Sequence, residues 1–199
     1  IFLEALTHPG WILEYLKNGG PPTMGSWVKY VKGKPTVDET VKLFTKNIPA
    51  TNQTWEDIKK YRDLWPKKLI IKGILHPEDA LKAIDCGVDG IILSNHGGRQ
   101  LDRAPTPIDV LPEISQLVGN KIDVMIDGGI RRGSDIIIAL CLGAKFVFIG
   151  RAGLYGAAAG GLEGIDKAYN ILREEIDQNL GQIGCTNISN LGDEWLFNK

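Results

Sequence analysis

From Lys68 onward the sequence alternates short apolar runs with helical patterns, and this alternation constrains the fold more than any other feature. The apolar runs are rich in isoleucine, leucine, valine or phenylalanine and cover residues 69–74, 90–93, 122–126 and 146–149. The helical patterns that follow them cover residues 77–87, 108–118, 134–142 and 164–180. Continuous apolar strands that alternate with helices are typical of a parallel sheet buried on both faces. We therefore expect an α/β fold.

A repeated pattern favours one kind of α/β fold over another. The pattern Asp-x3-Ala-x3-Gly occurs at residues 79–87 and again at residues 135–143, each time just before an apolar run. Repetition at the level of βα pairs favours a (β/α) barrel over a doubly wound sheet. An eight-unit barrel has about 250 residues, so four units correspond to about half of such a barrel.

Residues 1–68 lack this regular alternation. Residues 11–16 form one short helical pattern, and residues 37–44 form another within a stretch of lysines, isolated aromatics and small turns. Thr54, followed three residues later by an aspartate, is typical of a helix start. We therefore divide the chain into a variable segment with a leading helix at 1–68 and an α/β region at 69–199.

The composition indicates a folded protein without a strongly charged partner. The chain has 199 residues, and 43% of them are hydrophobic, which supplies a core and argues against disorder. The formal net charge of −1 offers no basic excess for binding nucleic acid. No apolar run reaches the roughly 20 residues of a membrane-spanning helix, and no secretory signal is visible.

The three cysteines, Cys86, Cys141 and Cys185, lack the spacing of a disulfide framework or a metal site. We therefore expect reduced thiols, a cytoplasmic protein and no bound metal. The chain begins with Ile1, and its first methionine is Met24. On that basis we expect it to be a piece of a longer protein or a processed chain.

Polar or glycine-rich residues gather near the carboxyl end of each apolar run. The candidate segments are Lys72 in the first run, residues 94–102 after the second, residues 127–133 after the third, and Gly150 with Arg151 after the fourth. In a parallel α/β fold the carboxyl ends of the strands form the functional edge. We therefore expect these segments to contribute to one site.

The segments at 127–133 and 150–151 together predict a phosphate site. Adjacent glycines let backbone N–H groups converge on one group of oxygens, and a helix that begins near Gly133 would add its positive end. Arg131 and Arg151 supply charge. Loops after the seventh and eighth strands of such barrels commonly bind phosphate. The alternative is that the glycines serve only tight turns and that the arginines are solvated.

His96 and Arg99 follow the second apolar run directly. A histidine there can remove a proton, and a guanidinium nearby can hold a carboxylate with two hydrogen bonds. The alternative is a loop histidine with satisfied bonds and a surface arginine. Lys72 interrupts an apolar run, and buried lysines are uncommon unless paired. An ion pair with a carboxylate, an anionic ligand and a Schiff base all remain open for it.

Taken together, four segments resemble the FMN-dependent α-hydroxy-acid dehydrogenase and oxidase family. They are residues 69–73 with Lys72, residues 94–102 with the sequence SNHGGRQLD, residues 127–133 with DGGIRRG, and residues 149–151 with IGR. The resemblance covers about residues 55–184 and is greatest to the mandelate and lactate dehydrogenases. It implies the C-terminal half of a (β/α)8 TIM barrel, with strands 5–8 preceded by the variable segment that follows strand 4.

The resemblance also implies a reaction and a role for each site residue. The reaction is oxidation of an L-2-hydroxy acid, of the mandelate, lactate or glycolate class, to the 2-keto acid with FMN as cofactor. His96 would act as the base, Arg99 would bind the substrate carboxylate, and Lys72 would stabilise negative charge at the flavin N1 and C2-carbonyl edge. Ser94 would contact the flavin ring. The ribityl chain and phosphate would be held by Asp127, Gly128, Gly129, Arg131, Gly150 and Arg151.

The expected partners follow from the same resemblance. The electron acceptor stays open among quinone, cytochrome and oxygen, and a homo-oligomer, usually a tetramer in this family, is expected. Residues 8–50 correspond to a segment that docks on the bilayer in membrane-associated members, so peripheral contact with the cytoplasmic face of the inner membrane is one option. A solvated loop is the other. The aromatic and basic residues that could form such an interfacial patch are Trp11, Trp27, Lys29, Tyr30, Lys32 and Lys34.

Two other functions remain open. The first is a non-catalytic half-barrel that binds phosphate or assembles with a missing half, because four parallel strands would leave two open edges. The second is another phosphate-binding barrel, such as a Schiff-base aldolase that uses Lys72. The segment at residues 94–100 has no role in that second reading.

Overall fold

The computed structural model describes residues 2–21, 23–33, 35–47 and 52–197. The chain divides into two compact units, Ile1–Gln53 and Thr54–Lys199, and each is described by itself. In the predicted membrane segment, residues 8–50, the positions 22, 34 and 48–50 lie outside the described ranges. Within the described ranges, no helix is both long enough and apolar enough to span a bilayer.

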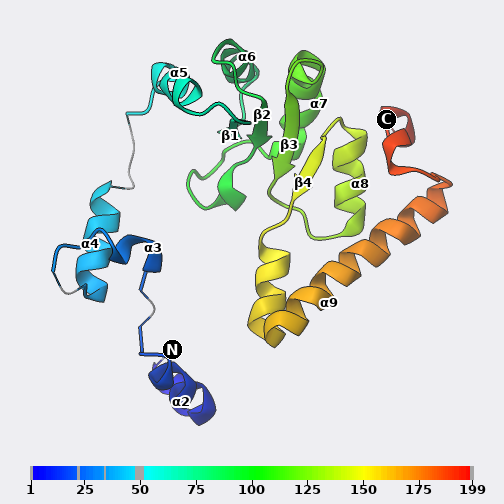
Figure 1. Cartoon of the computed structure of the whole chain (residues 1–199). Helices are drawn as coiled ribbons and strands as arrows, with labels where there is room; N and C mark the ends of the chain where they lie inside the picture. The colour runs from blue at the N-terminus through cyan, green and yellow to red at the C-terminus, as the bar shows by residue number, and fades with distance from the viewer. Residues whose placement is uncertain (1, 22, 34, 48–51, 198–199) are drawn as a thin grey trace. The chain divides into compact units, whose positions relative to one another are not determined.

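The N-terminal unit consists of short helices. They are α1 (Phe2–Leu6), α2 (Pro9–Lys17), α3 (Gly25–Val28) and α4 (Val37–Asn47) (Figure 1). Helices α2 and α4 contain the predicted helical patterns. Trp11 stacks on Tyr15 with ring centroids 5.1 Å apart, and Trp27 meets Phe44 edge-on at 5.6 Å. These four rings thus pack on one another within the unit, and α2 buries none of its residues.

The second unit contains a four-stranded parallel sheet with strand order β1-β2-β3-β4 (Figure 1). The strands are β1 (Ile70–Ile74), β2 (Gly90–Leu93), β3 (Asp123–Asp127) and β4 (Phe146–Phe148). Each strand matches a predicted apolar run to within one residue at either end. The register aligns Lys72, Ile92, Met125 and Phe146 across the sheet, so Lys72 lies on the outermost strand at one side.

Five helices accompany the sheet. They are α5 (Trp55–Leu64), α6 (Pro77–Asp85), α7 (Pro107–Val118), α8 (Gly133–Cys141) and α9 (Arg151–Ile183), with short 3-10 turns at His96–Gly98, Ile188–Asn190 and Asp193–Trp195. Helix α5 begins as predicted, because the Thr54 N–H and hydroxyl donate to Asp57 Oδ2 at 3.0 and 2.8 Å. Lys60 and these bonds from Thr54 lower the pKa of Asp57 to about 2.

One face of the sheet is buried, whereas the other is largely open and buries Met125 alone of the residues aligned with Lys72, so the prediction of burial on both faces is wrong for this chain. On the buried face Ile91 and Ile126 are fully enclosed in a core built with α6, α7 and α8. On the other face Ile70, Phe146 and Phe148 stay exposed, with Phe146 at 56%. The physical reason is that strands of a half-barrel have no opposing strands to cover their inner face.

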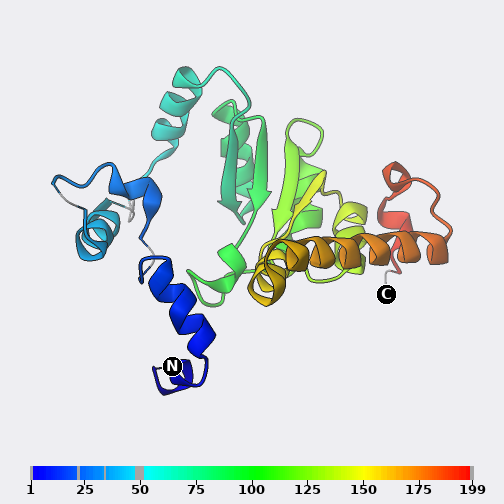
Figure 2. The same ribbon diagram turned by 60° about the horizontal axis from the view of Figure 1, so that its bottom comes forward.

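Helix α9 is longer than the predicted helix at 164–180, and it breaks at Gly160 and Gly161. A first arm follows β4 directly, and a second arm continues at an angle to it (Figures 1 and 2). The arms meet where Gly156 and Gly164 face each other, since a Cβ on either glycine would collide with the backbone of the other. The first arm escaped prediction because its glycines lower helix propensity.

Candidate active site

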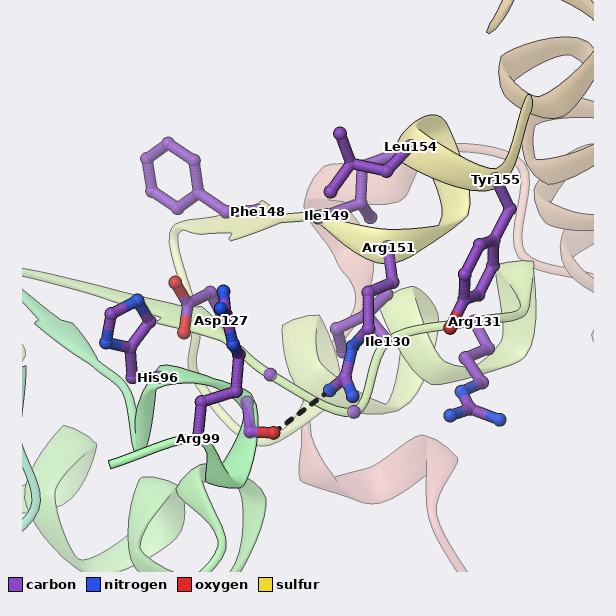
Figure 3. Close-up of a pocket in the computed structure, with 14 residues that line it drawn as sticks. His96, Arg99, Asp127, Ile130, Arg131, Phe148, Ile149, Arg151, Leu154 and Tyr155 are labelled. Atoms are coloured by element: carbon purple, nitrogen blue, oxygen red, sulfur yellow. Dashed lines mark hydrogen bonds between the residues drawn. The ribbon is translucent and has the colours of Figure 1, made fainter. Parts of the chain in front are cut away.

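The segments predicted from the sequence meet at the carboxyl edge of the sheet and line two adjoining cavities. In Figure 2 the loop after β2 and the first arm of α9 lie at the same end of the sheet. A cavity of about 440 Å³ is lined by His96, Arg99, Asp127, Gly128, Gly129, Arg131, Gly150 and Arg151 (Figure 3). A second cavity of about 530 Å³ is lined by Lys72 and Ser94, and again by His96. The imidazole of His96 therefore stands where the two cavities adjoin.

Lys72 links three strands at this edge. Its ammonium lies 2.7 Å from Asp127 Oδ2 on β3 and donates to the Ser94 hydroxyl oxygen, also at 2.7 Å. Of the three explanations left open for this lysine, the ion pair is present. The Lys72 side chain is 46% exposed on the open face, so it is not the buried lysine that the apolar run suggested. An ammonium in this position can meet a negatively charged ligand as well as Asp127.

The other carboxylate oxygen of Asp127 points to a ligand. Among the described residues, Asp127 Oδ1 is buried and has no hydrogen-bond partner. A buried polar atom left unpaired costs about 1–3 kcal/mol, and more when it is charged. A ligand that brings a hydroxyl donor to this oxygen would remove the cost. The ribityl chain of FMN carries such hydroxyl groups, so Asp127 fits its expected place beside that chain.

The His96 loop has an unusual backbone. His96 has a φ of 57°, and Gly97 and Gly98 follow with φ of 67° and 72°. A residue with a side chain rarely adopts a positive φ, and such strain is concentrated at functional sites. The Ser94 hydroxyl oxygen accepts from the His96 N–H at 3.1 Å, and Asn95 Oδ1 accepts from the Gly98 N–H at 3.2 Å. Bonds within this short segment thus support the conformation that presents the imidazole.

Arg99 lies on the same side of this site as His96. Figure 3 shows both side chains directed toward the part of the cavity where Asp127 lies. Within the described ranges, neither the Arg99 guanidinium nor the His96 ring has a hydrogen-bond or ion-pair partner. A free guanidinium can hold the carboxylate of a small molecule. A free imidazole beside it can accept a proton from the same molecule.

The loops after β3 and β4 bring together groups that suit an anion. Gly128 and Gly129 have φ of 100° and 80°, which only glycine adopts readily. Helix α9 begins at Arg151, has no acidic residue in its first turn, and in the described structure its first three N–H groups have no acceptor. Arg131 and Arg151 have no carboxylate partner among the described ion pairs. Free N–H groups at a helix start, beside two guanidiniums, favour a phosphate.

The start of α8 does not belong to this anion site, contrary to expectation. Asp135 Oδ2 accepts from the N–H groups of Arg131 and Arg132 at 2.8 and 2.9 Å. Glu175 Oε2 accepts from the Gly133 N–H at 2.7 Å, and its other oxygen pairs with Arg132 at 3.1 Å. Because carboxylates of the protein already hold these donors, α9 rather than α8 offers a free helix end.

The 440 Å³ cavity also contains residues that sequence reasoning missed. These are Phe148, Leu154 and Tyr155, whereas Gly97, Ile130 and Ile149 lie within the segments that the sequence had already singled out. Two of them carried a usable signal. Alternate residues of a strand share a face, so Phe148, two residues before Gly150, could be expected on the side of the site. Residues one turn apart share a helix face, so Tyr155 could be expected on the same side as Arg151. The missed helical arm of α9 explains why Leu154 and Tyr155 were overlooked.

The fold and this edge place the chain in a known family. The profile of the FMN-dependent dehydrogenase family matches residues 1–198, and the chain therefore belongs to this family. It is 42% identical over 199 residues to (S)-mandelate dehydrogenase of Pseudomonas putida, covering all of this chain and 49% of that protein. It is 44% identical over 158 residues to a peroxisomal (S)-2-hydroxyacid oxidase of Arabidopsis thaliana, covering 79% and 44%. FMN is the cofactor of this family, as the resemblance implied.

Solved structures agree with the fold. A crystal structure described as monotopic membrane protein (S)-mandelate dehydrogenase superposes with a TM-score of 0.91 at 42% identity, covering all of this chain and 52% of that one. A mandelate oxidase solved with benzoyl-formic acid gives a TM-score of 0.66 at 41% identity, covering 69% and 41%. The chain thus spans about half the length of these relatives. Its sheet corresponds to the C-terminal half of a TIM barrel, which confirms the predicted fold.

Proposed function

We propose that the protein to which this chain belongs oxidises an L-2-hydroxy acid to the 2-keto acid with FMN. The observation that carries the proposal is the meeting of Lys72, Asp127 and His96 at one edge, next to a free helix end. Relatives named for this chemistry include the mandelate dehydrogenase and the hydroxyacid oxidase described above. Because the chain spans about half of those relatives, the proposal concerns the whole protein.

The described residues fit the cofactor. When bound, FMN supplies an acceptor for two electrons. Its phosphate suits the first turn of α9 with Arg131 and Arg151, and a ribityl hydroxyl suits Asp127 Oδ1. The Lys72 ammonium would stabilise negative charge on the flavin edge. The Ser94 hydroxyl oxygen already accepts from Lys72 and from the His96 N–H, so its own proton is left to donate to the flavin ring.

The described residues also fit a hydroxy acid. The Arg99 guanidinium would bind the carboxylate with two hydrogen bonds, which fixes the α-carbon beside His96. Oxidation of the alcohol to the ketone removes two electrons and two protons from the substrate. The His96 imidazole would accept one of these protons, either from the hydroxyl or from the α-carbon. A Schiff-base reaction has less support, because an ammonium ion-paired with Asp127 is not a nucleophile.

The electron acceptor and the assembly state belong to the same proposal. Quinone, cytochrome and oxygen are retained as candidate acceptors, and a homo-oligomer, a tetramer by family resemblance, is proposed. Aerobic turnover that produces hydrogen peroxide would identify oxygen, whereas turnover that requires an added quinone or cytochrome would identify a dehydrogenase. Light scattering on the purified protein reports the number of subunits.

Peripheral membrane contact through residues 8–50 is part of the proposal. A structural relative is described as a monotopic membrane protein. On α2 the side chains of Trp11, Leu13 and Leu16 are exposed by 56%, 69% and 63%. Apolar and aromatic side chains on a surface helix favour insertion at a bilayer interface. Co-sedimentation with anionic vesicles should fall when Leu13 and Leu16 are both replaced by serine, and unchanged co-sedimentation would argue for a solvated segment.

A second candidate function is favoured by the open face of the sheet. Exposed Ile70, Phe146 and Phe148 suit a non-catalytic half-barrel that binds phosphate or assembles with a separate half. Intact mass and N-terminal sequencing of the protein from its native source distinguish the two functions. A natural product limited to these 199 residues would favour the second candidate.

The direct test of the proposed function is anaerobic reduction of the flavin. The full-length holoprotein should lose its oxidised flavin absorbance on addition of (S)-mandelate, (S)-lactate or glycolate, and should keep it with (R)-mandelate. The acid that reduces fastest identifies the side-chain class. If the protein binds FMN but none of these acids reduces it, the proposed reaction is wrong.

A further inference from the structure

One hydrogen bond joins the anion site to the histidine loop. Arg151 Nη2 donates to the carbonyl oxygen of Gly97 at 3.2 Å, and Gly97 directly follows His96 (Figure 3). The two residues follow strands β4 and β2, which are separated in the sheet by β3. In the described part of the chain, no other hydrogen bond ties residues 95–99 to a loop that follows another strand. The contact is therefore a direct polar link between the start of α9 and the histidine loop.

The histidine loop needs support of this kind. Three consecutive positive φ angles, at His96, Gly97 and Gly98, form a backbone that residues with side chains rarely adopt. The bonds from Ser94 and Asn95 hold the ends of this turn. The Gly97 carbonyl and the Gly98 N–H belong to one peptide group, which Asn95 holds at the N–H and the guanidinium holds at the carbonyl. This peptide is the second one after His96, so the guanidinium constrains the backbone that carries the imidazole.

The guanidinium is placed to contact an anion at the same time. A Cβ on Gly97 would lie only 2.8 Å from Arg151 Nη2, so the guanidinium rests directly against the loop backbone. A guanidinium has five N–H donors, and the Gly97 carbonyl uses one of them. Arg151 is also the first residue of α9, whose first N–H groups are free. One side chain can thus bind a phosphate and the loop together.

We propose that Arg151 is a positioning residue for His96, through which a phosphate bound at the start of α9 fixes the catalytic loop. A bound phosphate orders the guanidinium, and the ordered guanidinium holds the Gly97 carbonyl. The coupling is reciprocal, because whatever orders the loop also improves the anion site. The inference rests on the proposed function, since it gives His96 its role as base, but the contact and its response to phosphate can be measured separately.

The test compares two arginine variants by hydrogen–deuterium exchange of the full-length protein. Arg173→Lys is the matched control, because Arg173 is exposed on the second arm of α9, lines neither cavity and has no hydrogen bond or ion pair among the described contacts. Arg151→Lys keeps the charge, but an ammonium lacks the planar set of donors that can hold phosphate and carbonyl together. Each protein is measured without ligand, with inorganic phosphate, and with saturating FMN.

In the wild type and in Arg173→Lys, ligand should slow amide exchange in residues 97–100 by at least about 5-fold, the lower end of typical site-to-site coupling. In Arg151→Lys at saturating FMN the slowing should fall below about 2-fold. The pH dependence of flavin reduction should shift in Arg151→Lys and stay in place in Arg173→Lys. Equal protection of the loop in the two variants, or a wild-type loop indifferent to ligand, would overturn the proposal. Loop protection without any hydroxy-acid reduction would support the coupling and count only against the reaction.

Discussion

The Lys72 ammonium lies 2.7 Å from Asp127 Oδ2, although the two residues come from strands β1 and β3 with β2 between them. Ser94, at the end of β2, supports the bridge by accepting a hydrogen bond from the same ammonium. The bridge leaves Asp127 Oδ1 buried without a partner among the described residues. The Lys72–Asp127 ion pair thus leaves one buried carboxylate oxygen without a partner. This arrangement favours a role in ligand binding over a purely stabilising role.

Asp127→Asn should weaken FMN binding by about 10- to 100-fold, because hydrogen bonds to charged groups contribute about 1.5–3 kcal/mol. The change removes the negative partner of Lys72 and weakens the acceptor offered to the ribityl chain. Fluorescence titration of the full-length apoprotein with FMN measures the effect. Asp123→Asn, at the exposed start of the same strand, is the control and should bind FMN normally. Equal affinities for the two variants would remove Asp127 from the cofactor site.

Gly133→Ala should destabilise the protein by about 1–3 kcal/mol, the usual cost of overpacking. A Cβ on Gly133 would lie 2.6 Å from the Ile176 backbone nitrogen in the second arm of α9. It would also push away Glu175, which caps the start of α8. Urea denaturation measures the loss. Gly181→Ala in α9 meets open space and should be neutral or stabilising, so a similar loss in both variants would contradict the close approach.

Asp89→Asn should lower stability at neutral pH, and the difference from the wild type should shrink in acid. Lys68, the Leu69 N–H and Arg62 hold the pKa of the Asp89 carboxyl well below its usual range. A carboxyl whose pKa is lowered by folding adds stability above its unfolded pKa. That stability disappears as the pH falls from about 4 toward the lowered value, because the unfolded chain then binds the extra proton.

Urea midpoints of the wild type and the variant at pH 7 and pH 3 measure this dependence. Asp63→Asn is the matched control, because Asp63 is exposed on α5 and has no ion pair among the described contacts. Its substitution should change the urea midpoint little. A difference between Asp89→Asn and the wild type that grows in acid would have the wrong sign for this explanation.

The sequence predicted the sheet and the gathering of the site for a physical reason. Continuous apolar runs are typical of parallel strands, and the carboxyl ends of parallel strands converge, so we expected the polar residues after each run to meet. The ion pair of Lys72 was one of several explanations that the strand alone left open. The position of His96 and Arg99 after a strand suggested a base and a carboxylate ligand but left a loop histidine and a surface arginine open, and the family resemblance favoured the first pair of roles.

Other features depend on contacts between distant parts of the chain and could not be predicted. Glu175 caps α8, which begins 42 residues earlier in the chain. The Gly133 N–H, expected to face a phosphate, therefore donates to a carboxylate of the protein instead. The hydrogen bond from Arg151 to Gly97 spans 54 residues. The open face of the sheet arises from strands that this chain does not contribute, whereas the apolar pattern reports only that a face can be buried. The sequence pattern of a single element carries none of this information.

The most direct test of the central claim is the anaerobic rate of flavin reduction by the best L-2-hydroxy acid in the wild type and in His96→Ala. Removing a general base should slow reduction by at least about 100-fold while FMN stays bound. His8→Ala, in the N-terminal unit, is the control and should reduce at the wild-type rate. A His96→Ala protein that holds FMN and is reduced within a few-fold of the wild-type rate would contradict the assignment of His96 as the base.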